Sequence, residues 1–216
     1  MSQGLFWALL LGAVTVGSLH SLAPDHWVPF AALARARGWS AARSARITVL
    51  CGFGHVTVSV LLGLLGLAFG LQLLRSFGER MESVAGILLV GFGLAYGLWG
   101  LRRAAGRHFH GHLHQHYDHV HDESRLTTGT LFLLFSADPC VAVIPILAAA
   151  APLGAVKTAA IVMAYEIATI GTMVALVLPA RAGATALRLP WLDRYGDAAA
   201  GGLIVAVGLL VAALGW

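Results

Sequence analysis

Six long apolar stretches divide the chain, and they constrain its fold more than any other feature of the sequence. A helix needs about 20 apolar residues to cross the roughly 30 Å hydrocarbon core of a bilayer. The 216 residues are also 58% hydrophobic and only 11% charged, which is unlike a soluble domain. We therefore expect an all-α integral membrane protein with six transmembrane helices. The apolar stretches cover residues 4–33, 47–74, 83–101, 128–152, 155–180 and 197–216.

Basic residues are concentrated in alternate connections between these stretches. If the stretches are transmembrane helices, eleven arginines lie on one side of the membrane and three basic residues lie on the other. The positive-inside rule then predicts a bacterial inner-membrane protein with both termini outside and residues 102–127 in a cytoplasmic loop. The same arginines account for the net charge of +4, so we do not expect a nucleic-acid partner. The cytoplasmic set is Arg35, Arg37, Arg43, Arg46, Arg102, Arg103, Arg107, Arg125, Arg181, Arg188 and Arg194, and the outer set is Arg75, Arg80 and Lys157.

The two ends of the chain, residues 1–101 and 128–216, look like repeats of one three-helix unit. The proline-containing segment 24–29 of the first apolar stretch corresponds to segment 138–145 of the fourth, and the third and sixth stretches share a glycine-rich pattern. Because each unit has an odd number of helices, the second is inverted relative to the first, as in many secondary transporters. Proline removes a backbone donor and interrupts a helix. We therefore predict two inverted repeats with proline-broken first and fourth helices.

Ionisable side chains inside the apolar stretches are the candidate functional residues, because such groups are costly in a membrane. At a rise of 1.5 Å per residue, those of the second, fourth and fifth stretches lie about 13 to 15 Å from one end of their helices. This common depth predicts a site near the middle of the bilayer. The ionisable residues are His20, Asp25, His26, His55, Asp138 and Glu166.

The segment from His20 to Pro29 is the most informative part of the sequence. In a continuous helix, His20 and His26 would lie about 240° apart around the axis and could not bind one ion. Breaks at Pro24 and Pro29 would free the carbonyls of His20 and Asp25 and let the ligands surround a cation. Two imidazoles and a carboxylate suit nickel, cobalt or zinc better than calcium or magnesium. The alternative is that Pro24 only starts a short helix that Asp25 and His26 cap near the interface.

Polar residues of three further stretches are candidates for the same pathway. Cys51, His55 and Ser59 are spaced four residues apart, so they lie on one face of a helix beside two glycines that allow close packing. We predict His55 as a metal ligand, with a hydrogen-bonded buried histidine as the alternative, and Cys51 as a packing residue. Glu166 could instead extend toward the outer surface. The residues expected along the pathway or around the ligands are Cys51, Ser59, Asp138, Cys140, Glu166 and Thr169.

A histidine-rich segment lies in the loop between the two repeats. This density of imidazoles is typical of metal-binding segments, and the absence of a zinc-finger spacing argues against one fixed geometry. We predict a flexible chelator that captures or buffers metal, with a pH-sensitive linker as the alternative. The histidines are His108, His110, His112, His114, His116, His119 and His121.

Two of these motifs resemble those of a known family. The pattern His20-x4-Asp25-His26 resembles a signature of the nickel/cobalt transporter superfamily, and the segment 54–58, Gly-His-Val-Thr-Val, resembles its second signature. The resemblance is closest to the six-span branch that includes urease-accessory membrane proteins and nickel/cobalt efflux proteins, and the efflux proteins also carry a His-rich cytoplasmic loop. Ala23 stands where the permease signature usually has an acidic residue. The resemblance implies metal-ligand roles for His20, Asp25, His26 and His55.

These features predict transport of a divalent transition-metal ion, nickel or cobalt before zinc or copper, rather than enzymatic catalysis. We expect no prosthetic cofactor; the expected partners are the metal ion, the lipid bilayer and a second copy of the chain. One alternative is a thiol–disulfide reductant conduit around Cys140, although its second cysteine would have to stand where the first repeat has His26. Another is an exporter of an anion such as sulfite, although no apolar stretch holds a central basic residue. A membrane enzyme would need a nucleophile or substrate pocket that the sequence does not reveal.

Overall fold

The protein is described by a computed structural model at residues 2–69, 71–106, 120–138, 140, 142–186 and 190–214. Every regular element in these residues is helical, as predicted, and four of the helices are long and apolar enough to cross a membrane. Those four are α1, α3, α7 and α8. The elements are α1 (Ser2–His20), α2 (Pro24–Ala36), α3 (Ala41–Phe69), α4 (Leu71–Gly106), α5 (Val120–Ala137), α6 (Val143–Ala150), the short 3₁₀ helix η1 (Ala151–Leu153), α7 (Ala155–Ala186) and α8 (Pro190–Leu214).

Large apolar side chains point outward from these helices. Leu11 of α1, Leu133 of α5 and Ile167 of α7 are each about two-thirds exposed, at 68%, 69% and 67%. Patches of this kind are unfavourable in water, and a lipid environment would cover them. The exterior therefore fits an all-α membrane protein.

The first apolar stretch is broken, as predicted, but at one proline and not at two. Helix α1 ends at His20 and α2 begins at Pro24. Proline is favoured at the first position of a helix, where its missing N–H has no intrahelical partner. Pro29, in contrast, lies inside α2 and does not end it, so the expected second break is wrong. Pro29 removes only one backbone hydrogen bond, to the carbonyl of Asp25, and the rest of the helix tolerates this loss.

The fourth apolar stretch is also broken. Helix α5 ends at Ala137 and α6 begins at Val143, while Pro139 lies outside the described residues. Pro145 falls in the first turn of α6, where no intrahelical donor is needed, so it does not free a carbonyl as expected. Two smaller boundaries differ as well. Residues 71–74 belong to α4 and not to the preceding helix, and α7 extends to Ala186, beyond the predicted end at residue 180.

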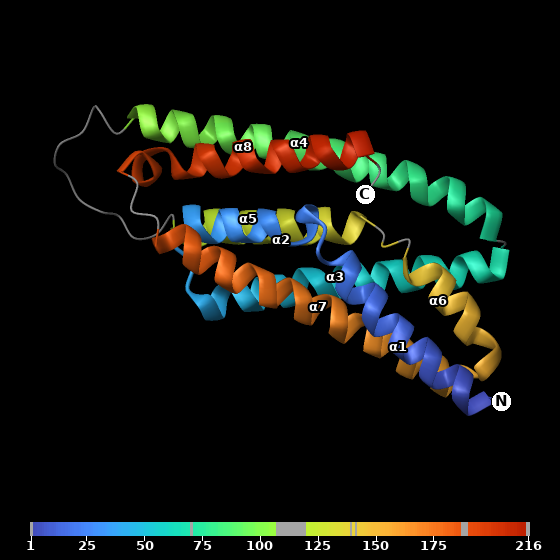
Figure 1. Ribbon diagram of the computed structural model, residues 1–216. Helices are drawn as coiled ribbons and strands as arrows, with labels where there is room; N and C mark the ends of the chain where they lie inside the picture. The colour runs from blue at the N-terminus through green and yellow to red at the C-terminus, as the bar shows by residue number, and fades with distance from the viewer. Residues whose placement is uncertain are drawn as a thin grey trace.

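Helices α4 and α8 lie side by side along most of their length (Figure 1). Glycines on both helices make this approach close. A Cβ atom at Gly93 would lie 2.7 Å from the backbone nitrogen of Val205, and one at Gly208 would lie 2.7 Å from that of Val90. The two glycine-rich helices therefore pack against each other, as small residues allow in membrane proteins.

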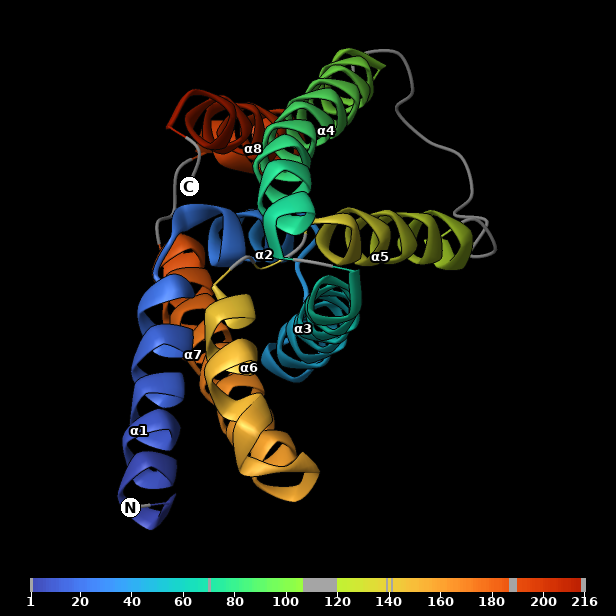
Figure 2. The ribbon, with the colours of Figure 1, turned by 90° about the vertical axis from the view of Figure 1, so that its right-hand side faces the viewer.

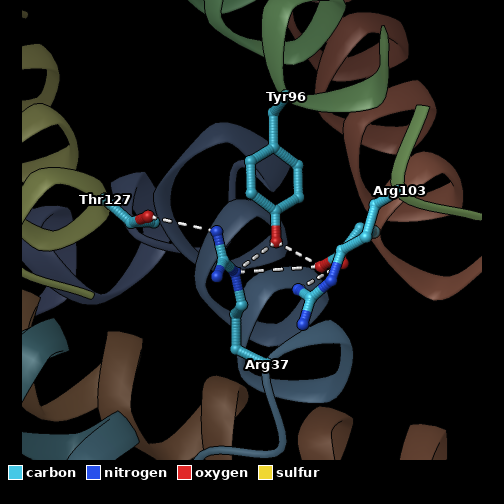
Figure 3. Close-up of polar contacts among 5 residues, drawn as sticks. Arg37, Tyr96, Arg103 and Thr127 are labelled. Atoms are coloured by element: carbon cyan, nitrogen blue, oxygen red, sulfur yellow. Dashed lines mark hydrogen bonds and ion pairs between the residues drawn. The ribbon is translucent and has the colours of Figure 1, made fainter. Parts of the chain in front are cut away.

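Helix α2 lies near the middle of the assembly, against α3, α7 and α8 (Figure 2). Its C-terminal end is held by a polar cluster that also involves α4, α5 and α8 (Figure 3). Arg37 Nε donates to the Tyr96 hydroxyl at 2.8 Å, and that hydroxyl donates to Asp197 Oδ1 at 2.6 Å. Arg103 lies 3.4 Å from Asp197 Oδ2, and Arg37 Nη2 lies 3.4 Å from Thr127 Oγ1. Two of the arginines that suggest membrane orientation thus also join four helices.

Candidate metal site

Three histidine rings meet at the break between α1 and α2. His20 ends α1, His26 lies in the first turn of α2, and His55 lies in the middle of α3. The ring centroids are 4.3 Å apart for His20 and His26, 5.2 Å for His26 and His55, and 6.2 Å for His20 and His55. A continuous helix would have held His20 and His26 on different faces, so the break creates this cluster.

The hydrogen bonds of His55 determine which of its nitrogens can bind a ligand. Its Nδ1 lies 3.1 Å from the carbonyl oxygen of Phe135, in the last turn of α5. Carbonyls in the last turn of a helix have no intrahelical donor, so this one is free to accept. Because a carbonyl can only accept, Nδ1 carries the proton and Nε2 presents a lone pair. The ring of His55, which is only 1% exposed, is thus held with its Nε2 unprotonated and without a hydrogen-bond partner among the described residues.

The same ring nitrogen is buried and unsatisfied in all three histidines. The Nε2 atoms of His20, His26 and His55 have no hydrogen-bond partner among the described residues. Buried polar atoms are nearly always paired, so three neighbouring exceptions indicate a missing partner. A metal ion could pair with His20 and His55, whose ligand atoms lie within 4.8 Å of each other and of Cys140, whereas the predicted ligands Asp25 and His26 do not belong to this group of close ligand atoms.

Two carboxylates approach the cluster from the side of α4 and α8. Asp25 Oδ1 lies 3.0 Å from His26 Nδ1, at ion-pair distance but without hydrogen-bond alignment. A carboxylate beside Nδ1 orients the ring and leaves Nε2 for a metal, as in many metal sites. Asp25 and Asp138 also line one small cavity of about 20 Å³, which is room for about one water-sized species.

A thiol also lies close to two of the histidines. Cys140, between α5 and α6, is 2% exposed, and ligand atoms of Cys140, His20 and His55 all lie within 4.8 Å of one another. The Cys140 backbone N–H donates to Ser59 Oγ at 2.6 Å, while the Ser59 hydroxyl donates to the carbonyl of His55 at 2.6 Å. Cys140 Sγ lies 2.6 Å from the Tyr165 hydroxyl. Ser59 therefore links the backbone of Cys140 to the helix that carries His55.

The remaining predicted pathway residues lie apart from this group. Cys51 is fully buried in an apolar cluster that includes Phe30 and Met173. Thr169 is fully buried on α7, and its carbonyl oxygen lies 3.2 Å from Ser21 Oγ. Glu166 is half-buried on the same helix, with Oε1 unpaired among the described residues.

Most of the histidine-rich loop lies outside the described residues. Residues 107–119, which hold His108, His110, His112, His114, His116 and His119, lie outside the described residues. His121 falls in the first turn of α5, but its side chain is not described. The proposed chelating role stays a prediction.

Three contributors to the site were not predicted. Ser21 Oγ lies 2.7 Å from the carbonyl oxygen of Gly17 and so stabilises the end of α1. Tyr165 contacts Cys140, and its position could have been recognised from a four-residue periodicity, because it belongs to the buried stripe of α7 that includes Ile161 and Met173. Phe135 contributes a backbone carbonyl, for which the amino-acid type gives no signal.

The arrangement brings together imidazole nitrogens and a thiol, with two carboxylates nearby, which are ligand types that transition-metal ions accept. The two cysteines are free thiols that belong to separate apolar clusters, so the described residues hold no paired dithiol. No protein-family model, no curated protein and no solved structure matches this chain.

Proposed function

We propose that this protein transports a divalent transition-metal ion, nickel or cobalt in the first place, across a bacterial inner membrane. The observation that carries the proposal is the set of three buried imidazole Nε2 atoms without partners at a helix break. Nitrogen-rich sites bind nickel, cobalt, zinc and copper and bind magnesium or calcium poorly. A single binding site surrounded by apolar helices is what a carrier of such an ion requires.

The helix arrangement supports a six-span topology with two inverted repeats. If α1 with α2, α3 and α4 form one unit, then α5 with α6, α7 and α8 form the other. Several contacts recur under this exchange: α1 packs on α7 as α5 packs on α3, and α2 packs on α7 as α6 packs on α3. Both units also contribute a helix break to the cluster. This pattern is expected when a binding site lies between inverted repeats.

The histidine-rich loop fits the same function. With both termini outside, residues 102–127 would face the cytoplasm, where imidazoles can capture an ion before export or hold it after import. We propose a buffering role for this loop and a transport role for the buried cluster. The two roles can be separated because the loop and the cluster can be altered independently.

The test is to measure cellular metal in cells depleted of metal before expression. Nickel, cobalt, zinc and copper are followed by elemental mass spectrometry for the wild type, His26→Ala and His55→Ala. Cys51→Ala serves as the matched control, because Cys51 is also buried and lies one helix turn before His55, but outside the cluster. A variant with residues 108–121 deleted tests the loop.

The cellular content of one metal should change when the wild-type protein or Cys51→Ala is expressed. Neither histidine variant should reproduce this change. The sign of the change then gives the direction of transport. The loop deletion should alter the steady-state level while leaving some transport. The proposal is wrong if no metal responds to the wild-type protein, or if the histidine variants behave like the control at equal protein levels.

A further inference from the structure

The position of Cys140 adds a ligand type that the histidines do not provide. Three chain segments that are far apart in sequence bring His20, His55 and Cys140 together, with ligand atoms within 4.8 Å of one another. Cys140 is 2% exposed and His55 is 1% exposed. The Nε2 atoms of both histidines are buried without a hydrogen-bond partner among the described residues, so the sulfur lies close to two imidazoles that each have an unpaired ring nitrogen.

We propose, resting on the proposed transport function, that Cys140 is a sulfur ligand of the transported ion together with His20 and His55. The cargo then belongs to the transition metals that accept thiolate, and oxygen-preferring ions such as magnesium, calcium and manganese are excluded. In a tetrahedral complex, neighbouring ligand atoms are about 3.5 Å apart, a spacing that three atoms within 4.8 Å of one another can reach by small side-chain movements.

The hydrogen bonds around Cys140 suit a ligand. Its backbone is fixed by the donation to Ser59 Oγ, which in turn is bonded to the carbonyl of His55. A metal-bound thiolate has no proton, so the Tyr165 hydroxyl at 2.6 Å must then donate to the sulfur. Outer hydrogen bonds of this type orient metal ligands and strengthen binding. Tyr165 is therefore a positioning residue for Cys140.

Charge balance also favours a thiolate. A divalent ion inside a membrane needs compensating negative charge, because isolated charges are costly there. Cys140 loses its proton to solvent when the metal binds. The thiolate and the carboxylate of Asp25 then supply two negative charges, while His20 and His55 bind as neutral ligands.

Cobalt is the probe, because a cobalt–thiolate bond gives an intense charge-transfer band in the near ultraviolet. The full-length protein in detergent is titrated with cobalt(II) as wild type, Cys140→Ser, Cys51→Ser and Tyr165→Phe. Cys51 is the matched control, since the sequence holds only two cysteines and both are buried. Thermal unfolding of each variant reports whether it is folded.

The wild type and Cys51→Ser should show the sulfur band, and Cys140→Ser should lose it and bind cobalt at least about tenfold more weakly. Tyr165→Phe should keep the band and lose about tenfold in affinity. The inference is overturned if the band survives in Cys140→Ser, or if the wild type binds cobalt without it; the transport proposal survives the second result. If the wild type binds no cobalt at all, the sulfur-ligand inference and transport of cobalt are both refuted.

A second measurement does not depend on folding of the Cys140→Ser variant. X-ray absorption of the cobalt complex of Cys51→Ser reports whether sulfur is bound to the metal, and Cys140 is then the remaining thiol. A sulfur atom at about 2.3 Å supports the ligand role, and a shell of nitrogen and oxygen alone overturns it.

Discussion

Gly17 is a position where a single methyl group should disturb the candidate metal site. It lies in α1 three residues before His20 and packs directly on α7. A Cβ atom there would lie 2.9 Å from the backbone carbonyl oxygen of Tyr165 and 2.9 Å from Thr169 Oγ1, whereas ordinary contacts begin at about 3.4 Å. Because one neighbour is backbone and the other is a β-branched side chain in a helix, neither can yield easily. The Gly17→Ala substitution should therefore push α1 away from α7 by about half an ångström.

The energetic effect can be separated from helix propensity by a matched variant in the same helix. A Cβ atom at Gly12 would meet no atom within 4 Å. Both substitutions gain about 0.5 to 1 kcal/mol from replacing glycine in a helix, but only Gly17→Ala has the overpacking cost of about 1 to 3 kcal/mol. The difference between the two variants is therefore about 1 to 3 kcal/mol, which corresponds to a gap of about 2 to 12 °C in Tm for a chain of this size.

The assay compares thermal unfolding of both variants and the wild type in one detergent, followed by cobalt titration. Gly17→Ala should unfold at the lower temperature and bind cobalt about tenfold more weakly, because His20 moves with the end of α1. Gly12→Ala should bind cobalt like the wild type. Equal Tm values for the two variants would refute the packing of α1 on α7, and a lower Tm with unchanged cobalt affinity would refute the link between Gly17 and the site.

Three further predictions concern other contacts. Gly93→Ala should be less stable than Gly91→Ala by about 1 to 3 kcal/mol and should have the lower Tm, because a Cβ at Gly93 meets α8 backbone and one at Gly91 meets nothing within 4 Å; equal Tm values would contradict the α4–α8 packing. Tyr96→Phe removes a hydroxyl bonded to both Arg37 and Asp197, and should cost about 1 to 3 kcal/mol in a mixed-micelle unfolding titration; no loss would show that this cluster is not stabilising. Ser59→Ala should leave the Cys140 N–H unpaired, weakening cobalt binding and cobalt–sulfur absorption together; an unchanged titration would contradict the link.

Features of the fold that depend on local chemistry can be predicted from the sequence. Proline at position 24 is compatible with a helix only near its start, so the break after His20 follows from the chain alone. Small residues in the third and sixth apolar stretches predict close helix contact, and α4 and α8 show it. The break that the sequence predicts at Pro29 is wrong, because whether a proline breaks a helix depends on how many hydrogen bonds it removes and on which side chains pack around it.

The remaining parts of the site depend on contacts between distant segments. The carbonyl of Phe135 becomes available only because α5 ends two residues later, and the end of a helix is poorly defined by sequence. The grouping of Cys140 with His20 and His55 depends on how α6 and α1 dock on α3 and α7. A depth estimate places residues along the membrane normal, but it does not determine which side of a helix faces the other helices. The position of Glu166 relative to the histidines therefore does not follow from its depth.

The two helix breaks are held by different but comparable anchors, and under the proposed transport function these anchors are where we expect the site to open. At the first break, Ser21 contacts the carbonyl of Thr169 on α7, and at the second, Cys140 contacts Ser59 on α3 and Tyr165 on α7. Helices α3 and α7 are continuous where they face the site, so the breaks are the parts of the chain that can bend. Motion that separates α1 from α7 removes His20 from the cluster, and motion of the chain after α5 away from α3 removes Cys140. Either motion leaves His55 in place on α3, so it lowers the number of ligands without requiring a continuous helix to unfold.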